Sequence, residues 1–223
     1  MATTRRVRLP NDERRAQLLQ LGTRVFSSRP YDEISIDELA DSAGVSKGLL
    51  YHYFPSKRDF YVETVRAASL HLRRLTEPDA SLAPGARLRA AIDGHLNYVR
   101  EHGRIYASIF RGSIVAPQIQ EIWNEHREIM MQRLLENIAI ARPSPLLGSA
   151  LRAWIAMVEG VSLDWLANPR VEQGALRELL IASYGALLRR ATTLDSAALA
   201  APGRQSAAGA RAPRPARRRA RRA

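Results

Sequence analysis

Hydrophobic and polar residues follow the period of amphipathic helices along most of this chain, and no stretch shows the two-residue alternation of a β-strand. Proline and glycine clusters interrupt the pattern and mark the breaks between elements. The pattern therefore predicts an all-α protein without internal repeats. Its helices are expected over residues 11–28, within 35–54, and over 57–76, 86–102, 104–110, 117–141, 146–167 and 171–192.

Residues 35–54 contain two short helices whose ends are well specified. Ser35 and Glu38 have the spacing of a capping box, in which each side chain bonds a free backbone N–H at the start of a helix. Gly44 can adopt the positive φ angle of a sharp turn, and Ser46 can cap the second helix. The segment therefore has the form of a helix-turn-helix.

The second helix begins with residues that are unfavourable for a helix alone. Acids suit the positive end of a helix dipole, yet the first turn of this helix holds Lys47, Gly48 and Leu49. The stretch from residue 47 to residue 58 contains no acid. The lysine and the glycine each cost about 0.3–1 kcal/mol relative to good choices. A phosphate or a guanine edge over this terminus would favour a lysine and require a small residue for close approach. The pattern indicates a DNA-reading helix.

An ordinary helical hairpin with core aromatics is the alternative for this segment. It would explain Tyr51 and Phe54, but neither the acid-free helix start nor the lysines. Lys47 and Lys57 are the only two lysines in a chain that otherwise uses arginine for every base. Their place at the two ends of this helix agrees with DNA binding, although two residues can also fall there by chance.

Residues 11–65 resemble the N-terminal domain of the tetracycline-repressor (TetR) family of bacterial transcription regulators. The resemblance lies in a helix ending Val25-Phe26, in Ile34-Ser35-Ile36, and in Ile36-x-x-Leu39-Ala40-x-x-Ala43-Gly44-Val45-Ser46-Lys47-Gly48-x-Leu50-Tyr51-x-Tyr53-Phe54-x-Ser56-Lys57. It implies a recognition helix over residues 46–54. The resemblance implies that the bases of DNA are faced by Lys47, Gly48, Leu49, Tyr51 and His52. It implies that the phosphates are faced by Ser46, Tyr53 and Lys57. Ser35, at the cap of the first helix, completes the expected DNA-binding set.

Length and composition agree with a protein that folds in a reducing cytoplasm. The chain has 223 residues, 46% of them hydrophobic, and no cysteine, so it can bury a large core without disulfides. The basic residues near the start precede a polar segment, which is unlike a signal peptide. The longest uncharged run, residues 179–188, is far shorter than the roughly 20 residues that span a bilayer. We therefore expect a cytoplasmic protein with no membrane partner.

The positive charge is concentrated at the C-terminal end. The net charge is +12, and residues 196–223 carry eight arginines and no acid. This tail, rich in alanine, proline and arginine, is predicted to be disordered, either as a solvated extension or as a segment that binds phosphates regardless of base sequence. The expected division is a helix-turn-helix domain over 1–55, a connecting helix with a regulatory and dimerisation domain over 56–194, and the basic tail over 195–223.

The helices expected over 146–167 and 171–192 are too apolar for the surface of a monomer. The first carries a stripe with Leu151, Trp154 and Val158, and beside it a second, small-residue face that includes Gly160. Two such helices from each of two chains can bury one another as a four-helix bundle. We expect a homodimer, which the TetR resemblance also implies, and a thick single-chain core is the alternative.

The regulatory region also carries large residues that can line a cavity for an apolar or amphipathic small molecule. For each aromatic residue, ordinary core packing is the alternative. Glu159 can bind a cationic or hydroxylated ligand, or it can form a salt bridge with Arg152. The expected lining residues are Tyr98, Phe110, Trp123, His126, Met130, Trp154, Met157 and Glu159.

Enzyme functions find little support in the sequence. It lacks the common nucleotide-binding, metalloprotease and serine-hydrolase motifs, and its five histidines include no i, i+4 pair, so no cofactor or metal is expected. The sequence predicts a ligand-responsive transcriptional regulator, most simply a repressor, that binds a palindromic double-stranded DNA operator as a homodimer and is released by a small effector. A nucleoid-associated protein that coats DNA through its arginine-rich tail is the alternative.

Overall fold

The computed structural model describes residues 11–111 and 117–200, and this part of the chain is helical, with no strand. The all-α prediction is confirmed. A short 3₁₀ turn, Tyr31–Glu33, lies between the first two helices. The helices are α1 (Asn11–Ser28), α2 (Ile36–Ser42), α3 (Lys47–Tyr53), α4 (Lys57–Leu75), α5 (Pro84–Arg111), α6 (Pro117–Asn137), α7 (Pro145–Ala167) and α8 (Gln173–Ala200).

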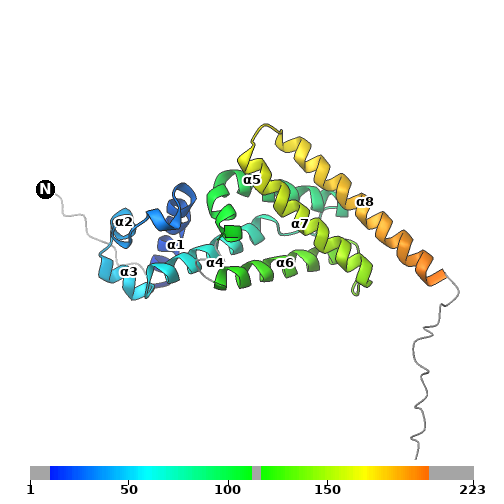
Figure 1. Ribbon diagram of the computed structural model, residues 1–223. Coiled ribbons are helices and arrows are strands. Elements are labelled where there is room, and N and C mark those ends of the chain that lie inside the picture. The colour runs from blue at the N-terminus through cyan, green and yellow to red at the C-terminus, as the bar shows by residue number, and fades with distance from the viewer. Residues whose placement is uncertain (1–10, 112–116, 201–223) are drawn as a thin grey trace, which may run out of the picture.

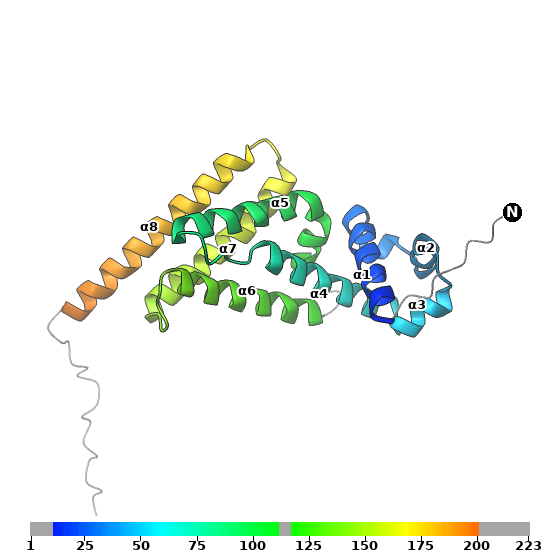
Figure 2. The same cartoon turned by 180° about the vertical axis from the view of Figure 1, so that it is seen from behind.

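The helices form an elongated molecule with a small head at one end. Helices α1, α2 and α3 make up the head, and α4 leads from it into a larger body built with α5, α6 and α7 (Figure 1). Helix α8 runs along the outer side of that body, away from the head, where it packs against α7 and α5 (Figure 2). The head and the body therefore share α4 as a continuous element.

A close crossing of α1 and α4 fixes the head on this connecting helix. Gly22 of α1 is buried against α4, and a Cβ atom at this position would lie only 2.5 Å from Oγ1 of Thr64 and 2.8 Å from Cζ of Phe60. Phe26, one turn further on, packs edge-on against the ring of Tyr61, with 4.9 Å between the ring centroids. Gly22 and Phe26, on successive turns of α1, therefore set the distance between the two helices.

The break expected after residue 102 is present, and one helix end differs from the sequence-based expectation. Helix α5 consists of two helical segments that meet at His102, whose backbone is non-helical (φ −125°, ψ 29°). Helix α6 ends at Asn137 and not at residue 141, because Ala139 adopts a left-handed φ of 54°. The N–H of Ile140 then donates to the carbonyl of Leu135 at 3.0 Å, which closes the helix in a Schellman-type turn.

Helix α8 continues further than the sequence suggested. It runs to Ala200, so the expected boundary after residue 194 falls inside the helix. Asp195 accepts a hydrogen bond from the hydroxyl of Ser144, and Ser144 in turn caps α7 by accepting from the N–H of Leu147 at 3.0 Å. The remainder of the predicted basic tail, residues 201–223, lies outside the described residues.

Helix α7 is the one element of the described chain with the length and apolar composition of a membrane-spanning helix. Arg152 and Glu159 lie on it, and its buried side packs against α5, α6 and α8. A core helix of a folded domain has the same properties.

Candidate DNA-binding helix and effector pocket

The ends of α2 and α3 are formed as the sequence predicted. The Ser35 hydroxyl accepts from the N–H of Glu38 at 3.0 Å, and the Glu38 carboxylate accepts from the N–H of Ser35 at 2.7 Å, which completes the capping box. These bonds and Arg29 hold the pKa of Glu38 at about 2. Gly44 has a φ of 61°, and Ser46 caps α3 through the N–H of Leu49.

Helix α3 is anchored by one fully buried side chain, and most of its other residues are exposed. Leu50 is fully buried against the head, whereas residues 46–49 are exposed on the helix start. Tyr51 and His52 are also exposed, and Tyr51 keeps 41% of its surface accessible despite its size. Leu49 and Tyr51 therefore leave apolar surface in water, which a binding partner could cover. This surface contains all five residues that the family resemblance assigned to bases.

Gly48 is not required by the packing of the protein itself. A Cβ atom at this position would meet no protein atom nearer than the hydroxyl oxygen of Ser46, at 4.0 Å, and the backbone is ordinary helix. Glycine inside a helix is unfavourable relative to alanine. The absence of a side chain therefore leaves free space on the outer face, where a large ligand can approach the backbone closely.

Lys47 has a partner that the sequence reading missed. Its ammonium lies 2.9 Å from Oδ1 of Asp37 on α2, and this hydrogen bond raises the pKa of Lys47. The sequence has no acid between residues 47 and 58, but α2 brings Asp37, ten residues before Lys47, to the start of α3. Both side chains are exposed, so the pair can exchange for another partner.

The expected phosphate-facing residues lie at the edges of this surface. Tyr53 is half-buried, and its ring lies 5.3 Å from that of His52. Lys57 stacks over the ring of Tyr31, with its ammonium 4.1 Å from the ring centroid, and partial burial lowers its pKa. Ser35 and Ser46 are exposed but already serve as helix caps. The role of Tyr31 in holding Lys57 had no signal in the sequence pattern.

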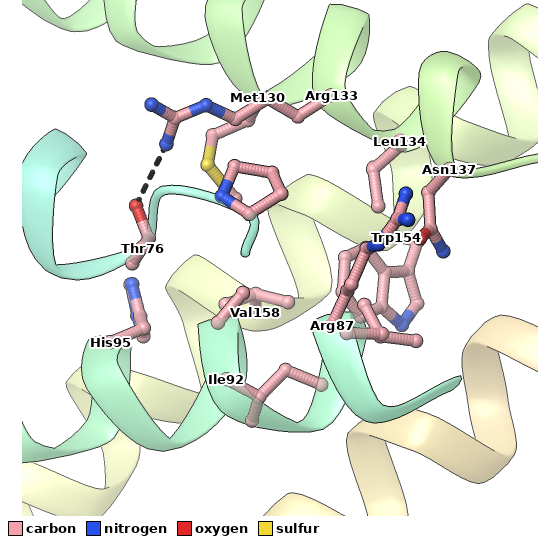
Figure 3. A pocket seen from close by; sticks show the side chains of 13 residues that line it. Thr76, Arg87, Ile92, His95, Met130, Arg133, Leu134, Asn137, Trp154 and Val158 are labelled. Carbon is pink, nitrogen blue, oxygen red and sulfur yellow. Dashed lines mark hydrogen bonds between the residues drawn. The ribbon is translucent and has the colours of Figure 1, made fainter. Parts of the chain in front are cut away.

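The body contains a small pocket with a volume of about 50 Å³ between α5, α6, α7 and the end of α4 (Figure 3). Its wall is mainly apolar, with five polar residues among those that line it. The lining residues are Thr76, Pro78, Arg87, Leu88, Ala91, Ile92, His95, Met130, Arg133, Leu134, Asn137, Trp154 and Val158.

Two of the eight side chains expected to line an effector cavity, Met130 and Trp154, do line this pocket. The Trp154 indole N–H donates to the carbonyl of Leu180 at 3.0 Å, which ties the pocket wall to α8. The remaining side chains of that set pack elsewhere. Tyr98, Trp123 and His126 are buried in the core, Phe110 packs against it, Met157 packs against the core between α7 and α8, and Glu159 forms an ion pair. For these aromatic residues, the structure has the core packing that was the alternative.

Glu159 pairs with Arg127 of α6 and not with Arg152. The two guanidinium donors of Arg127 each lie 2.7 Å from one carboxylate oxygen of Glu159. Arg152 instead contacts the hydroxyl of Ser149, one turn earlier on the same helix. The expectation of an Arg152 partner was wrong because it considered only residues on α7, whereas α6 packs across that face.

Two histidines are buried in the body, and one of them, His95, lines the pocket. Ser162 donates its proton to the carbonyl of Val158, so Nε2 of His95, 3.0 Å away, donates to the Ser162 hydroxyl oxygen. Burial lowers the pKa of His95 to about 4. His126 stacks on Trp123 at 4.6 Å, and burial followed by nearby positive charges lowers its pKa to about 3. Both side chains are neutral at pH 7.

The outer faces of α7 and α8 are apolar and uncovered in the single chain. Ala153, Ala156 and Gly160 are exposed at helical spacing on α7, and a Cβ atom at Gly160 would meet nothing within 4 Å. Leu179 and Leu187 are exposed on α8. This face is the one that the sequence assigned to a partner chain. No cluster of three metal-binding side chains occurs among the described residues.

Together, the capped and outward-facing α3 on a three-helix head and the pocketed helical body define a helix-turn-helix DNA-binding protein with a separate regulatory region. Residues 18–64 match the family model described as "Bacterial regulatory proteins, tetR family", and residues 84–187 match "Tetracyclin repressor-like, C-terminal domain". The chain belongs to the TetR family of bacterial transcriptional regulators.

Individual relatives support the same assignment. The chain is 31% identical over 175 residues to the HTH-type transcriptional activator FasR of Mycolicibacterium smegmatis, covering 73% of this chain and 77% of FasR. It is 42% identical over 53 residues to the HTH-type transcriptional repressor KstR2 of the same species, covering 24% and 26% of the two chains. A crystal structure of a TetR-family regulator from Streptomyces coelicolor superposes with a TM-score of 0.79 and 29% identity, covering 85% of this chain and 86% of that one.

Proposed function

We propose that this chain is a homodimeric, ligand-responsive repressor that binds a palindromic operator through α3 and is released by a small apolar or amphipathic effector. The observation that carries the proposal is the surface of α3. Lysine and a glycine that the packing does not require stand at its start, followed by the exposed Leu49 and Tyr51. These side chains suit the major groove, where lysine can bind guanine and apolar groups can contact the thymine methyl.

The uncovered faces of α7 and α8 support the dimer. The face of α7 carries exposed small residues, and the face of the adjacent α8 carries exposed leucines. Such a surface suits packing against a second copy across a two-fold axis. A two-fold dimer places two copies of α3 on half-sites about one helical turn of DNA apart or a multiple of it. The operator is therefore expected to be palindromic.

The pocket supports regulation by a ligand. Its volume of about 50 Å³ is a third of the roughly 150 Å³ cavity that holds benzene in another protein, so even a small apolar effector has to move the pocket wall. The wall includes Thr76 at the end of α4, the helix that carries the head. A ligand that binds one arrangement of this wall more tightly shifts the protein toward that arrangement.

Occupancy mapping in cells tests this function directly. We expect a small number of genomic sites sharing one palindrome, and transcription of the adjacent genes should rise when the gene for this protein is deleted. A fall in transcription would make the protein an activator, as the name of FasR indicates for that relative. Binding spread over the chromosome without a motif would instead favour DNA coating by the arginine-rich C-terminal residues.

A further inference from the structure

Two arginines line the pocket, and no carboxylate does. Neither Arg87 nor Arg133 has an acid within ion-pair distance among the described residues, although most other buried or half-buried charges of the body do. Partial burial lowers the pKa of Arg133, which means that its positive charge is incompletely solvated. The pocket therefore carries positive charge without an ion-pair partner among the described residues, although the more distant Glu77 and Glu136 act on Arg133 electrostatically.

The donors of both arginines are occupied by neutral oxygen atoms. Nη1 of Arg133 donates to the carbonyl of Arg73 at 2.9 Å and to the hydroxyl oxygen of Thr76 at 3.1 Å (Figure 3). Nε and Nη2 of Arg87 donate to the carbonyls of Leu82 at 2.6 Å and Ala80 at 2.8 Å. A guanidinium has five N–H donors, so each arginine retains groups that can bind another acceptor.

These acceptors all lie at the end of α4 or in the segment that joins α4 to α5. Arg133 holds the last turn of α4 itself, whereas Arg87 holds the segment after it. A carboxylate binds a guanidinium more strongly than a neutral oxygen does, because it adds the attraction between opposite charges and can accept two parallel N–H bonds. An anion at Arg133 therefore competes with the contacts that fix the C-terminal end of α4.

The rest of the wall suits an aliphatic chain. Figure 3 shows the two guanidinium groups on either side of the pocket, and Ile92, Leu134, Val158 and the ring of Trp154 make up much of the apolar wall. A molecule with one negative end and an apolar remainder matches this distribution, because its charge can reach Arg133 while its chain stays against the apolar side chains.

We infer that the effector is an amphipathic anion, most simply an alkyl carboxylate, whose head group pairs with Arg133 in place of the α4 contacts and whose chain lies toward Trp154. This inference rests on the proposed function, because it names the ligand class of that regulatory pocket. Pairing with the head group draws Arg133 away from Arg73 and Thr76, and the position of α4 then changes with the ligand. The same contact accounts for recognition and for release of DNA.

Three probes with the same eight-carbon chain test the charge preference: octanoate, 1-octanol and octylammonium. Calorimetry on the full-length protein should show octanoate binding at least about tenfold more tightly than octanol, with octylammonium weakest. Octyl phosphate distinguishes the kind of anion: tighter binding than octanoate would identify a phosphate head group. Octanol binding as tightly as octanoate, or no binding of octanoate, would overturn the inference.

Substitutions at Arg133 test the location of the head group. Arg133→Gln should reduce the preference for octanoate over octanol to within about threefold, and Arg133→Lys, which keeps the charge, should retain most of it. Arg104→Gln, at an exposed site on α5, is the matched control and should change nothing. Loss of the preference in Arg87→Gln but not in Arg133→Gln would place the head group at the other end and refute the assignment.

Operator binding separates this inference from the proposed function. Octanoate should weaken operator binding by the wild-type protein and have no effect on Arg133→Gln. Release of the wild-type protein by octanol as well as by octanoate would refute the anionic effector and leave the regulator intact. Failure of the ligand-free wild-type protein to bind any palindrome would refute the proposed function itself.

Discussion

The ammonium of Lys47 at the start of α3 lies 2.9 Å from the carboxylate of Asp37 on α2, so the two helices of the reading head are joined by an exposed ion pair. Water screens both exposed charges, so the pair is weak and the lysine can exchange the acid for DNA. In the free protein, Asp37 therefore holds Lys47 in place and competes with DNA for it.

The first prediction concerns this exchange. Asp37→Asn should strengthen operator binding by up to about fivefold, because Lys47 is then free and a negative charge near the phosphates is removed. Lys47→Ala should weaken it by about 1–3 kcal/mol. In a double-mutant cycle measured by fluorescence anisotropy, the gain from Asp37→Asn should shrink when Lys47 is absent. An equal gain in both backgrounds would show that Asp37 acts independently of Lys47.

The second prediction uses Gly48 to separate folding from binding. Gly48→Ala should keep or raise the stability of the head, by up to about 1 kcal/mol, because alanine favours the helix and its methyl group meets no protein atom. Operator affinity should nevertheless fall. Gly44→Ala is the contrasting variant, since its φ of 61° makes any side chain strained and stability should drop. Unchanged operator affinity in Gly48→Ala would remove the argument for close approach of DNA at this residue.

The third prediction concerns the outer face of α8. Leu179→Glu should dissociate the dimer and abolish high-affinity operator binding, because the glutamate would be buried against the partner chain without a counter-charge. Leu70→Glu on α4 is the control, since Leu70 is 44% exposed and Leu179 is 49% exposed. Sedimentation equilibrium measures the oligomeric state of the two variants, and circular dichroism measures whether they remain folded. A dimeric Leu179→Glu variant would place the interface elsewhere.

The fourth prediction is a pH dependence of stability. Because burial lowers the pKa of His126 to about 3, the unfolded chain binds a proton at this residue well before the folded chain does. The free energy of unfolding should therefore fall as the pH drops from about 6.5 toward 5. His126→Phe keeps the stacking on Trp123 and should reduce this slope by up to about 1.4 kcal/mol per pH unit.

Urea titrations of the two proteins at pH 5, 6 and 7.5 measure the slope. At pH 7.5 the variant should be at least as stable, because Nδ1 of His126 has no hydrogen-bond partner and its removal leaves no polar group unsatisfied. Parallel stability curves for the wild-type protein and His126→Phe would show that His126 is not the group responsible.

The reading head could be predicted closely from the sequence because local chemistry specifies it. The cap at Ser35, the turn at Gly44 and the cap at Ser46 each depend on residues only a few positions apart, and all three formed as expected. The contacts of Lys47 with Asp37 and of Lys57 with Tyr31 were missed because they depend on how separate helices meet.

The pocket was less predictable for the same reason. Both Trp123 and Trp154 were expected to line a cavity because of their size. The packing of α5 against α6 buries Trp123 beside Tyr106, whereas Trp154 lies at the pocket wall. Arg133 had no signal in the sequence, since its role arises from its distance to the end of α4 and from the lack of an acid within ion-pair distance among the described residues.

A footprint of the full-length protein on its highest-affinity genomic site tests the central claim most directly, namely that a two-fold dimer reads DNA through α3. The wild-type protein should protect two symmetric half-sites centred about one helical turn apart or a multiple of it. Tyr51→Ala, which removes an exposed side chain and leaves the buried anchor Leu50 in place, should lose protection of both half-sites together at concentrations where the wild-type protein protects them. An asymmetric footprint, or full protection by a folded Tyr51→Ala variant at the same concentration, would contradict the account.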